Sequence, residues 1–289
     1  MTSAVGTSIG MAVAAALVGC GARTPLGGPG AGAAANDGGP AGIVDSSAAP
    51  ESGAPCGDGG PSELAYVLDG SGVLYRYDVS TGQATPLGTP QCSDGNVQWT
   101  MTASRDTAYI LYTDGPLYAV DLATLACTLT PFQPGQVGLD FDFGIAVTGS
   151  AGAERLYVYG LPQGGTNPIL AVSDLTSFVL TKVGEILPAP PPSTYPVNLT
   201  ADGAGHLYAF SPDGFLQQID PATGAVLQSA PTGVTTMGTW ATLAYGNDLH
   251  LWVGSEVVGY DLATRMQTSG TDAGVFAIGG SSVSACAGE

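Results

Sequence analysis

A degenerate phrase recurs five times along the chain: an aromatic or aliphatic pair, then an Asp, then Thr-Gly or its remnant. The copies read LYRYDVSTGQ, LYAVDLATLA, ILAVSDLTSF, LQQIDPATGA and VVGYDLATRM, and their anchoring acids are Asp78, Asp121, Asp174, Asp220 and Asp261. The number of residues between successive anchoring acids matches one four-stranded blade per repeat, since propeller repeats occupy roughly 40 to 50 residues. The repeats therefore predict an all-β fold, a five-bladed β-propeller of four-stranded antiparallel blades.

The second repeat shows the expected plan of one blade. Four short runs are rich in β-branched and aromatic residues and are bounded by Gly, Asp or Pro, which is typical of strands. We expect strands A to D at residues 99–103, 108–112, 117–121 and 127–131. Asp121 and Thr124 then fall in the C–D turn, where a short polar side chain can accept backbone N–H bonds. Turn chemistry thus explains the recurring Asp and Thr without catalysis.

The two ends of the repeat region complement each other. Blade one has no inner strand before Leu64, whereas residues 275–279 form a spare strand after the fifth repeat. Fitting the spare strand into the gap closes the ring and removes the exposed inner edges. We therefore expect the first blade to be completed by the end of the chain.

The N-terminal region predicts export and a flexible tether. Residues 1–22 are a short apolar run ending in small residues, as in a cleaved export signal. The stretch LVGC ending at Cys20 resembles a bacterial lipobox, which implies a lipidated Cys20; an ordinary cleaved signal peptide is the alternative. We expect a signal peptide at 1–19, a disordered Gly/Ala/Pro/Ser tether at 20–62 and the propeller at 63–289.

The charge balance excludes one class of partner. The chain has 24 acidic and 6 basic residues, a net charge of −18. Nucleic-acid binding is disfavoured because phosphate backbones require Lys and Arg. We expect a monomer outside the cytoplasm, facing the periplasm or cell surface, whose contact with the membrane is through the lipid anchor only.

Four cysteines remain besides Cys20, an even number that predicts two disulfides in an exported protein. No pair has the CxxC or CxxxxC spacing of a zinc site. Three connectivities are possible. We favour Cys92 with Cys127, between blades one and two, and Cys56 with Cys286, because ring closure brings the two ends of the domain together.

The phrases IDPATGAVLQ and LYRYDVSTGQ resemble the repeats of quinoprotein-type, YVTN-type and NHL-type propellers. The order of Cys92, Cys127, FQPGQVG and the terminal VSACAG is similar to uncharacterised bacterial envelope lipoproteins with a propeller domain. The resemblance implies a fold and a location, and it brings no activity. The chain departs from quinone-cofactor dehydrogenases because it lacks a tryptophan docking motif in every blade and a calcium-ligand set, so no cofactor is expected.

The candidate binding site lies at the mouth of the central channel. Alignment of the inner strands places Trp99, Phe143, Asn198 and Trp240 at equivalent entries. Two indoles could stack on a sugar or another flat ligand, with Gln98 and Asn198 supplying hydrogen bonds. The alternative is that these large side chains only plug a narrow channel.

The top face of the propeller, which surrounds the mouth of the channel, also carries acidic residues, and these allow two further hypotheses. Asp140 and Asp142 project from one side of a strand and could help to bind calcium, although Asp is also a turn residue. The leading function is non-enzymatic binding of a glycan or an envelope protein through this top face. The alternative is a five-bladed carbohydrate-active hydrolase that uses acids such as Asp140 or Asp142.

Overall fold

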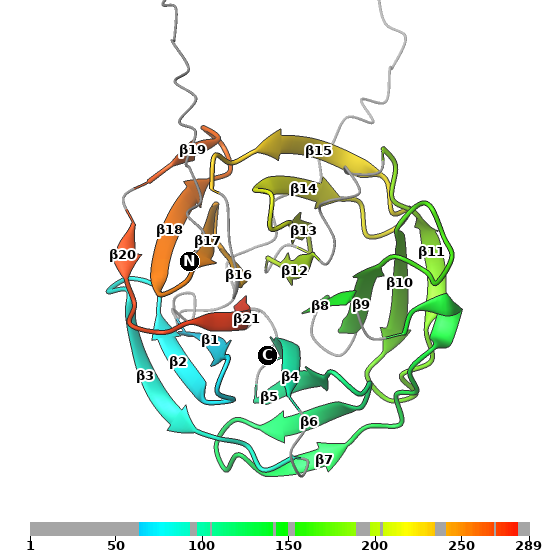
Figure 1. Cartoon of the computed structure of the whole chain (residues 1–289), viewed down its shortest axis with the longest axis horizontal. Helices are drawn as coiled ribbons and strands as arrows, with labels where there is room; N and C mark the ends of the chain where they lie inside the picture. Colours follow the sequence, from blue (N-terminus) through cyan, green and yellow to red (C-terminus); the bar gives the residue numbers. More distant parts are fainter. Residues whose placement is uncertain are drawn as a thin grey trace, which may run out of the picture. The chain divides into compact units, whose positions relative to one another are not determined.

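A computed structural model describes residues 64–92, 97–104, 106–140, 143–149, 154–188, 197–202, 205–234, 241–268 and 270–282. All of them belong to one compact unit, Pro50–Glu289. These residues form five antiparallel sheets arranged around a common centre, which is a five-bladed β-propeller (Figure 1). The predicted fold class is confirmed.

The strands of each blade follow one another from the centre of the ring outward. Blade one contains β21 (Ala277–Ser282), β1 (Leu64–Asp69), β2 (Leu74–Asp78) and β3 (Gln83–Gly88). Blade two contains β4 (Gln98–Ser104), β5 (Thr107–Tyr112), β6 (Leu117–Asp121) and β7 (Cys127–Leu129). Blade three contains β8 (Phe143–Thr148), β9 (Arg155–Gly160), β10 (Ile169–Asp174) and β11 (Thr181–Glu185). Blade four contains β12 (Asn198–Ala201), β13 (Leu207–Phe210), β14 (Phe215–Ile219) and β15 (Val226–Pro231). Blade five contains β16 (Thr242–Tyr245), β17 (Asp248–Val253), β18 (Glu256–Asp261) and an outer strand split into β19 (Met266–Gln267) and β20 (Thr271–Asp272).

Ring closure follows the predicted plan. The last strand, β21, pairs with β1 and supplies the inner strand of blade one, with Val67 opposite Gly280. This strand begins at Ala277, two residues after the predicted start. The inner strands contact one another in a closed circuit, β21 to β4, β8, β12, β16 and back to β21. Each of these five described strands therefore has a neighbour on both sides in the ring.

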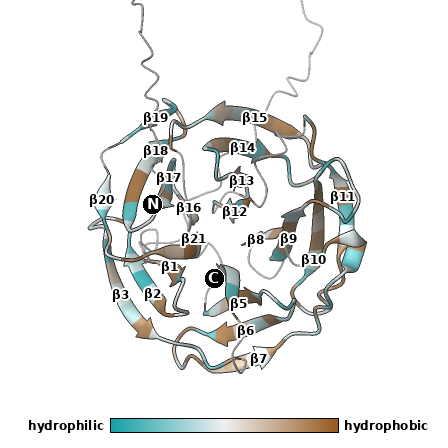
Figure 2. Ribbon diagram, viewed as in Figure 1, coloured by the Kyte–Doolittle hydropathy of each residue, from teal (hydrophilic) through white to brown (hydrophobic). Residues whose placement is uncertain are grey.

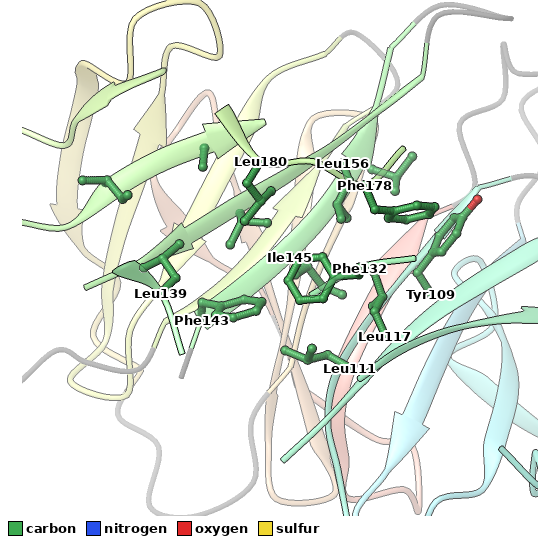
Figure 3. Packing of buried hydrophobic residues seen from close by; sticks show 14 residues of the cluster. Tyr109, Leu111, Leu117, Phe132, Leu139, Phe143, Ile145, Leu156, Phe178 and Leu180 are labelled. Carbon is green, nitrogen blue, oxygen red and sulfur yellow. The ribbon is translucent and has the colours of Figure 1, made fainter. Parts of the chain in front are cut away.

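The hydrophobic core consists of five separate seams, one between each pair of adjacent blades. The seam between blades two and three contains Phe132 and Phe143, whose ring centroids are 6.1 Å apart (Figure 3). Strand bodies supply the apolar residues and turns supply the polar ones; β18, for example, has hydrophobic valines between hydrophilic ends (Figure 2). Stability therefore depends on how faces of neighbouring blades fit together.

The C–D turns explain the repeat phrase. In blade two the Asp121 carboxylate accepts bonds from the backbone N–H and the hydroxyl of Thr124, at 2.7 and 2.8 Å. The chain then passes through a left-handed residue, which is Gly where the phrase is complete. The left-handed residues of the five turns are Gly82, Leu125, Phe178, Gly224 and Arg265. Three blades thus form the turn with a residue other than glycine at this position.

The outer edges of the blades interrupt the regular pattern that a second strand would need for pairing. An extra residue forms a bulge in three of the outer strands, at Leu87, Val183 and Leu227. The outer strand of blade two has three residues, and that of blade five is broken into β19 and β20 (Figure 1). Bulges and short edges oppose edge-to-edge association.

Candidate functional site

Trp99 lies on a β-bulge at the beginning of the inner strand of blade two. Gln98 pairs with Tyr112 and Thr100 pairs with Leu111, so Trp99 is an extra residue without an opposite partner. A bulge changes the direction of the side chain of its extra residue and is common beside functional sites. The half-buried indole packs on the seam between blades two and three. This end of the blade belongs to the top face, which carries the D–A loops and B–C turns.

Gln98 joins the top of blade two to blade one. A β-carbon built on Gly72, in the B–C turn of blade one, would lie 2.6 Å from Gln98 Nε2, so the end of the Gln98 side chain packs directly on this turn. The Gln98 side chain also hydrogen-bonds the phenol of Tyr112. Burial raises the pKa of Tyr112, and the bond from Gln98 partly offsets that rise. Gln98 therefore has structural contacts beside the Trp99 bulge.

Phe143 and Asn198 begin the inner strands of blades three and four, as the alignment predicts, and both are buried. Phe143 is 1% exposed and Asn198 is 3% exposed. The Phe143 ring faces Phe132 in the seam (Figure 3). Their buried positions leave Trp99 and Gln98 as the half-buried members of the predicted set. The fifth member, Trp240, lies outside the described residues.

Asn198 bridges the central channel. Its Oδ1 accepts the Thr242 N–H of blade five at 3.2 Å, and its Nδ2 donates to the Ile278 carbonyl of blade one at 3.5 Å. Blades four and one are not neighbours in the ring, so this second contact crosses the channel. An amide side chain is short, which means that the channel is narrow at this level.

A strained loop from the top face contacts the same seam as Trp99. Val137 has a φ of 49° inside the 3-10 helix η1 (Gln136–Gly138), and it packs against the seam between blades two and three. Positive φ is unusual for a β-branched residue and costs about 1–3 kcal/mol. The Gln136 side chain holds the loop, since its Oε1 accepts the Leu180 N–H at 2.8 Å. Such strain clusters at functional sites, and no sequence pattern indicated it.

The predicted calcium site stays a prediction. Asp140 is exposed at the end of the strained loop, and Asp142 lies outside the described residues. Among the described residues, no three His, Cys, Asp or Glu side chains come together as a metal-binding group. Another acid of this face, Asp69, is occupied by its own turn, because its Oδ1 accepts the N–H groups of Ser71 and Val73 at 2.9 Å.

A second polar cluster lies at the opposite end of blade four, and the sequence did not indicate that its three residues come together. His206 Nδ1 is 2.7 Å from Asp202 Oδ2, and the Tyr208 hydroxyl donates to the same oxygen at 3.3 Å. Burial, together with the Asp202 charge, raises the pKa of Tyr208. Asp202 also accepts the His206 backbone N–H at 2.8 Å, so this carboxylate organises the A–B turn. The arrangement fixes the imidazole beside a buried acid.

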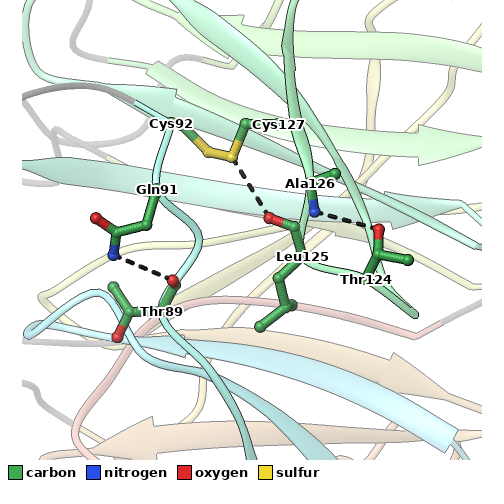
Figure 4. The surroundings of a disulfide bond; sticks show 7 residues. All are labelled: Thr89, Gln91, Cys92, Thr124, Leu125, Ala126 and Cys127. Carbon is green, nitrogen blue, oxygen red and sulfur yellow. Dashed lines mark hydrogen bonds between the residues drawn. A yellow bond between two sulfur atoms is a disulfide. The ribbon is translucent and has the colours of Figure 1, made fainter.

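Cys92 and Cys127 form a disulfide, which confirms one predicted pair (Figure 4). It joins the loop after blade one to the outer strand of blade two, next to Leu125 in the C–D turn. Disulfides are typical of compartments outside the reducing cytosol. Cys56, Cys286 and Cys20 lie outside the described residues. In the part of the chain that the structure describes, no helix is long and apolar enough to span a bilayer.

Comparison with known proteins finds similarity to solved structures. No protein-family model and no curated protein matches the chain. The structure of apo AztD from Citrobacter koseri is 16% identical, with 77% of this chain and 72% of that chain covered and a TM-score of 0.37. A protein of unknown function from Bacteroides caccae is 14% identical, with 74% of each chain covered and a TM-score of 0.41. PorZ of Porphyromonas gingivalis, a surface component of the type-IX secretion system, is 12% identical, with 76% and 27% covered and a TM-score of 0.40.

Proposed function

We propose that the protein is an exported, membrane-anchored lipoprotein whose propeller binds a ligand or a protein partner through its top face without turnover. The observation that carries the proposal is the Trp99 bulge. A β-bulge changes the direction of a side chain and is common beside active sites, and an indole offers a flat apolar face for stacking. The strained loop at Val137 contacts the same seam as Trp99, which is a second argument for a binding site at the top face.

Other exposed apolar side chains on the top face support a binding role. Val97 and Phe276 are each 58% exposed. The Phe276 carbonyl accepts the Gly70 N–H at 3.2 Å, and the Val97 carbonyl accepts the Thr113 N–H at 2.9 Å. These bonds place Phe276 beside the B–C turn of blade one and Val97 beside the B–C turn of blade two. Exposed apolar residues on one face favour contact with a partner.

The charges of this face favour neutral or cationic ligands. Within the described D–A loops and B–C turns there is no Lys or Arg, whereas Asp114, Asp140 and Asp213 are exposed there. A negative surface of this kind repels anions and attracts cations. A flat neutral ligand such as a sugar, or a partner with basic groups, therefore fits better than a phosphate or a carboxylate.

Ligand binding can be tested by isothermal titration of the exported protein with a panel of neutral glycans and small cationic aromatic compounds. Trp99→Ala should weaken binding at least tenfold, about 1.4 kcal/mol, whereas Trp99→Phe should retain part of the affinity. Trp240→Ala tests the predicted second indole. If no compound binds the wild-type protein, the top-face proposal fails. If bound glycans are cleaved, the hydrolase alternative is supported instead.

The anchor requires a separate experiment. Cys20→Ser should abolish acyl labelling and release the propeller from the membrane fraction, because the lipid would be its only membrane contact. Wild-type protein already found soluble, with a mature N-terminus other than Cys20, would refute the lipoprotein assignment. The blunted outer edges support a monomer, which light scattering can measure.

A further inference from the structure

Apolar side chains follow one another across the top of blades two and three. Val97, directly before β4, is 58% exposed, and Leu161, directly after β9, is 37% exposed. Trp99 and Val137 are half-buried, and both pack on the seam between these two blades. Pro134 is exposed in the same loop as Val137. Exposed apolar side chains gathered on one face mark contact with a partner.

The B–C turn of blade two joins the first of these residues to the loop at 130–140. The Val97 carbonyl accepts the Thr113 N–H of this turn at 2.9 Å. A β-carbon built on Gly115, at the other end of the same turn, would lie 2.8 Å from Pro134 Cβ. The turn therefore has Val97 on one side and Pro134 on the other.

The loop at 130–140 in turn contacts the B–C loop of blade three. A β-carbon built on Gly138, the residue after Val137, would lie 3.3 Å from Pro162 Cβ. The Gly138 carbonyl also accepts the Gln163 N–H at 2.9 Å. The three loops thus lie side by side and carry one apolar series, which consists of Val97, Trp99, Pro134, Val137, Leu161 and Pro162.

The two glutamines beside the apolar series are bonded to other parts of the protein. Gln136 Oε1 accepts the Leu180 N–H at 2.8 Å, and its Nε2 donates to the Phe178 carbonyl at 3.1 Å. Gln98 hydrogen-bonds the phenol of Tyr112. A small polar ligand is oriented by a few well-placed hydrogen-bonding groups, and these two amides are already engaged. The apolar series therefore offers mainly apolar contact.

The charged residues of the same loops are acidic. Asp114 and Asp140 are exposed, and the described loop residues, 97, 113–116, 130–140 and 161–168, include no Lys or Arg. Lys182, on the outer strand of blade three, is paired with Glu185 at 3.3 Å. Complementary charge across an interface steers encounter and fixes register. The apolar series therefore fits an apolar partner surface that is flanked by basic groups.

We propose that the apolar series is a docking surface for a protein segment in which Lys or Arg residues flank apolar side chains. The inference rests on the proposed binding role of the top face, and it selects a basic protein partner over a glycan. Apolar side chains of the segment cover Val97, Trp99 and Leu161, while its cations lie beside Asp114 and Asp140. Exposed apolar area and acidic charge, rather than hydrogen bonding, then determine which partner binds.

Selection from a random peptide library displayed on phage tests the class of partner. The wild-type protein should enrich peptides in which Lys or Arg flank apolar residues. A synthetic copy of the most enriched peptide is then titrated calorimetrically. Val97→Ser, Leu161→Ser should weaken its binding at least tenfold. Asp114→Asn, Asp140→Asn should also weaken binding and should reduce its dependence on salt.

Matched controls separate this surface from general attraction to an acidic protein. Leu87→Ser, Leu227→Ser removes two similarly exposed residues, 36% and 55%, from the outer strands of blades one and four. Asp213→Asn removes an exposed acid from the top of blade four. Each control should change the affinity less than twofold, and thermal unfolding checks that every variant folds. Losses as large in the controls as in the test variants overturn the proposal, as do selected peptides that lack basic residues.

A parallel titration with neutral glycans distinguishes failure of this inference from failure of the proposed function. If no peptide is enriched but a glycan binds and Trp99→Ala weakens its binding, the top face binds a ligand and the protein partner is wrong. If neither peptide nor glycan binds, both are wrong.

Discussion

A β-carbon built on Gly279 would lie 2.5 Å from the backbone nitrogen of Met101. Gly279 belongs to the closing strand of blade one and Met101 to the inner strand of blade two, so the two backbones touch with no side chain between them. The inter-blade distance at this seam is therefore set by a glycine. Where backbone atoms meet so closely, even a methyl group must displace a whole strand.

We expect Gly279→Ala to lower the free energy of unfolding by about 1–3 kcal/mol, the usual cost of overpacking. Gly280→Ala is the matched control, because the nearest atom to its added β-carbon is Val67 Cγ1, at 3.3 Å, a side-chain atom that can adjust. Urea denaturation followed by circular dichroism measures both. Equal midpoints for the two variants would contradict the close approach of β21 and β4.

Removal of the disulfide should destabilise the propeller. Cys92 and Cys127 are separated by 35 residues, and the chain-entropy model gives about 4 kcal/mol for a loop of this length. We expect the Cys92→Ala, Cys127→Ala variant to lose about 2–4 kcal/mol in urea denaturation. A variant as stable as the wild type would show that the bond constrains neither state.

The second disulfide stays a prediction, because Cys56 and Cys286 lie outside the described residues. Peptide mapping under non-reducing conditions should find these two cysteines in one cross-linked fragment. The Cys92→Ala, Cys127→Ala variant should then still lose stability on addition of a reductant. Free thiols at Cys56 and Cys286 would refute the pairing.

Arg265 offers a stabilising substitution. It has a φ of 58° in the C–D turn of blade five, where blades one and four have Gly82 and Gly224. A left-handed conformation costs an L-residue roughly 1–2 kcal/mol, part of which is offset by the greater unfolded-state entropy of glycine. We therefore expect Arg265→Gly to stabilise the fold by about 0.5–1 kcal/mol in urea denaturation.

The control for this substitution must account for one surface bond. Arg265 donates to Gln228 Oε1 at 2.9 Å, and Gln228→Ala removes that bond without changing the turn. Gly82→Ala is the reverse substitution and should destabilise, because its φ is 70°. If Arg265→Gly and Gln228→Ala both lower stability equally, the side-chain contact outweighs the backbone strain.

His250 should make the fold sensitive to mild acid. Burial lowers the pKa of His250 below the ordinary histidine value of 6.5, and the Asp248 charge partly opposes the shift. The ring lies 6.0 Å from that of Tyr77 across the seam between blades five and one. The folded state favours the neutral imidazole. The contribution of His250 to the free energy of unfolding is therefore complete above pH 6.5 and is lost as the pH falls through the folded-state pKa.

Urea denaturation between about pH 7 and pH 5 measures the effect. His250→Gln should have a smaller loss of stability over this range than the wild type. An unchanged pH dependence in His250→Gln would show that His250 does not titrate differently on folding.

The aspartates of the C–D turns affect the stability of the fold in a lower pH range. Hydrogen bonds from Ser177, followed by those of neighbouring N–H groups, lower the pKa of Asp174 to about 2. The Thr124 hydroxyl and backbone likewise lower the pKa of Asp121. Their contribution is complete above the ordinary aspartate pKa of 3.8 and is lost as the pH falls through the folded-state value. Asp121→Asn should therefore flatten the acid unfolding curve below about pH 4 while leaving the range from about pH 5 to 7 unchanged.

The turns and strands of each blade could be predicted because their causes are local. Asp121 and Thr124 bond within one turn, and the runs around them alternate as strands do. The regular interval between repeats places each repeat in the ring. The spare strand at the end of the chain then has one place to pair. Repeated local chemistry is sufficient to specify the number of blades.

The candidate site depended on contacts between blades, which no local pattern records. One extra residue in β4 changes the direction of the Trp99 side chain, and an alignment by spacing cannot detect such a bulge. Asn198 was placed correctly at a strand entry, but only the packed ring brings it to Ile278, 80 residues away in the chain. The sequence by itself determined the blades and their turns, because these are set by residues close together in the chain. The tertiary structure decided which side chains meet at the channel, because the register between blades is set by side-chain volume and backbone approach across the seams.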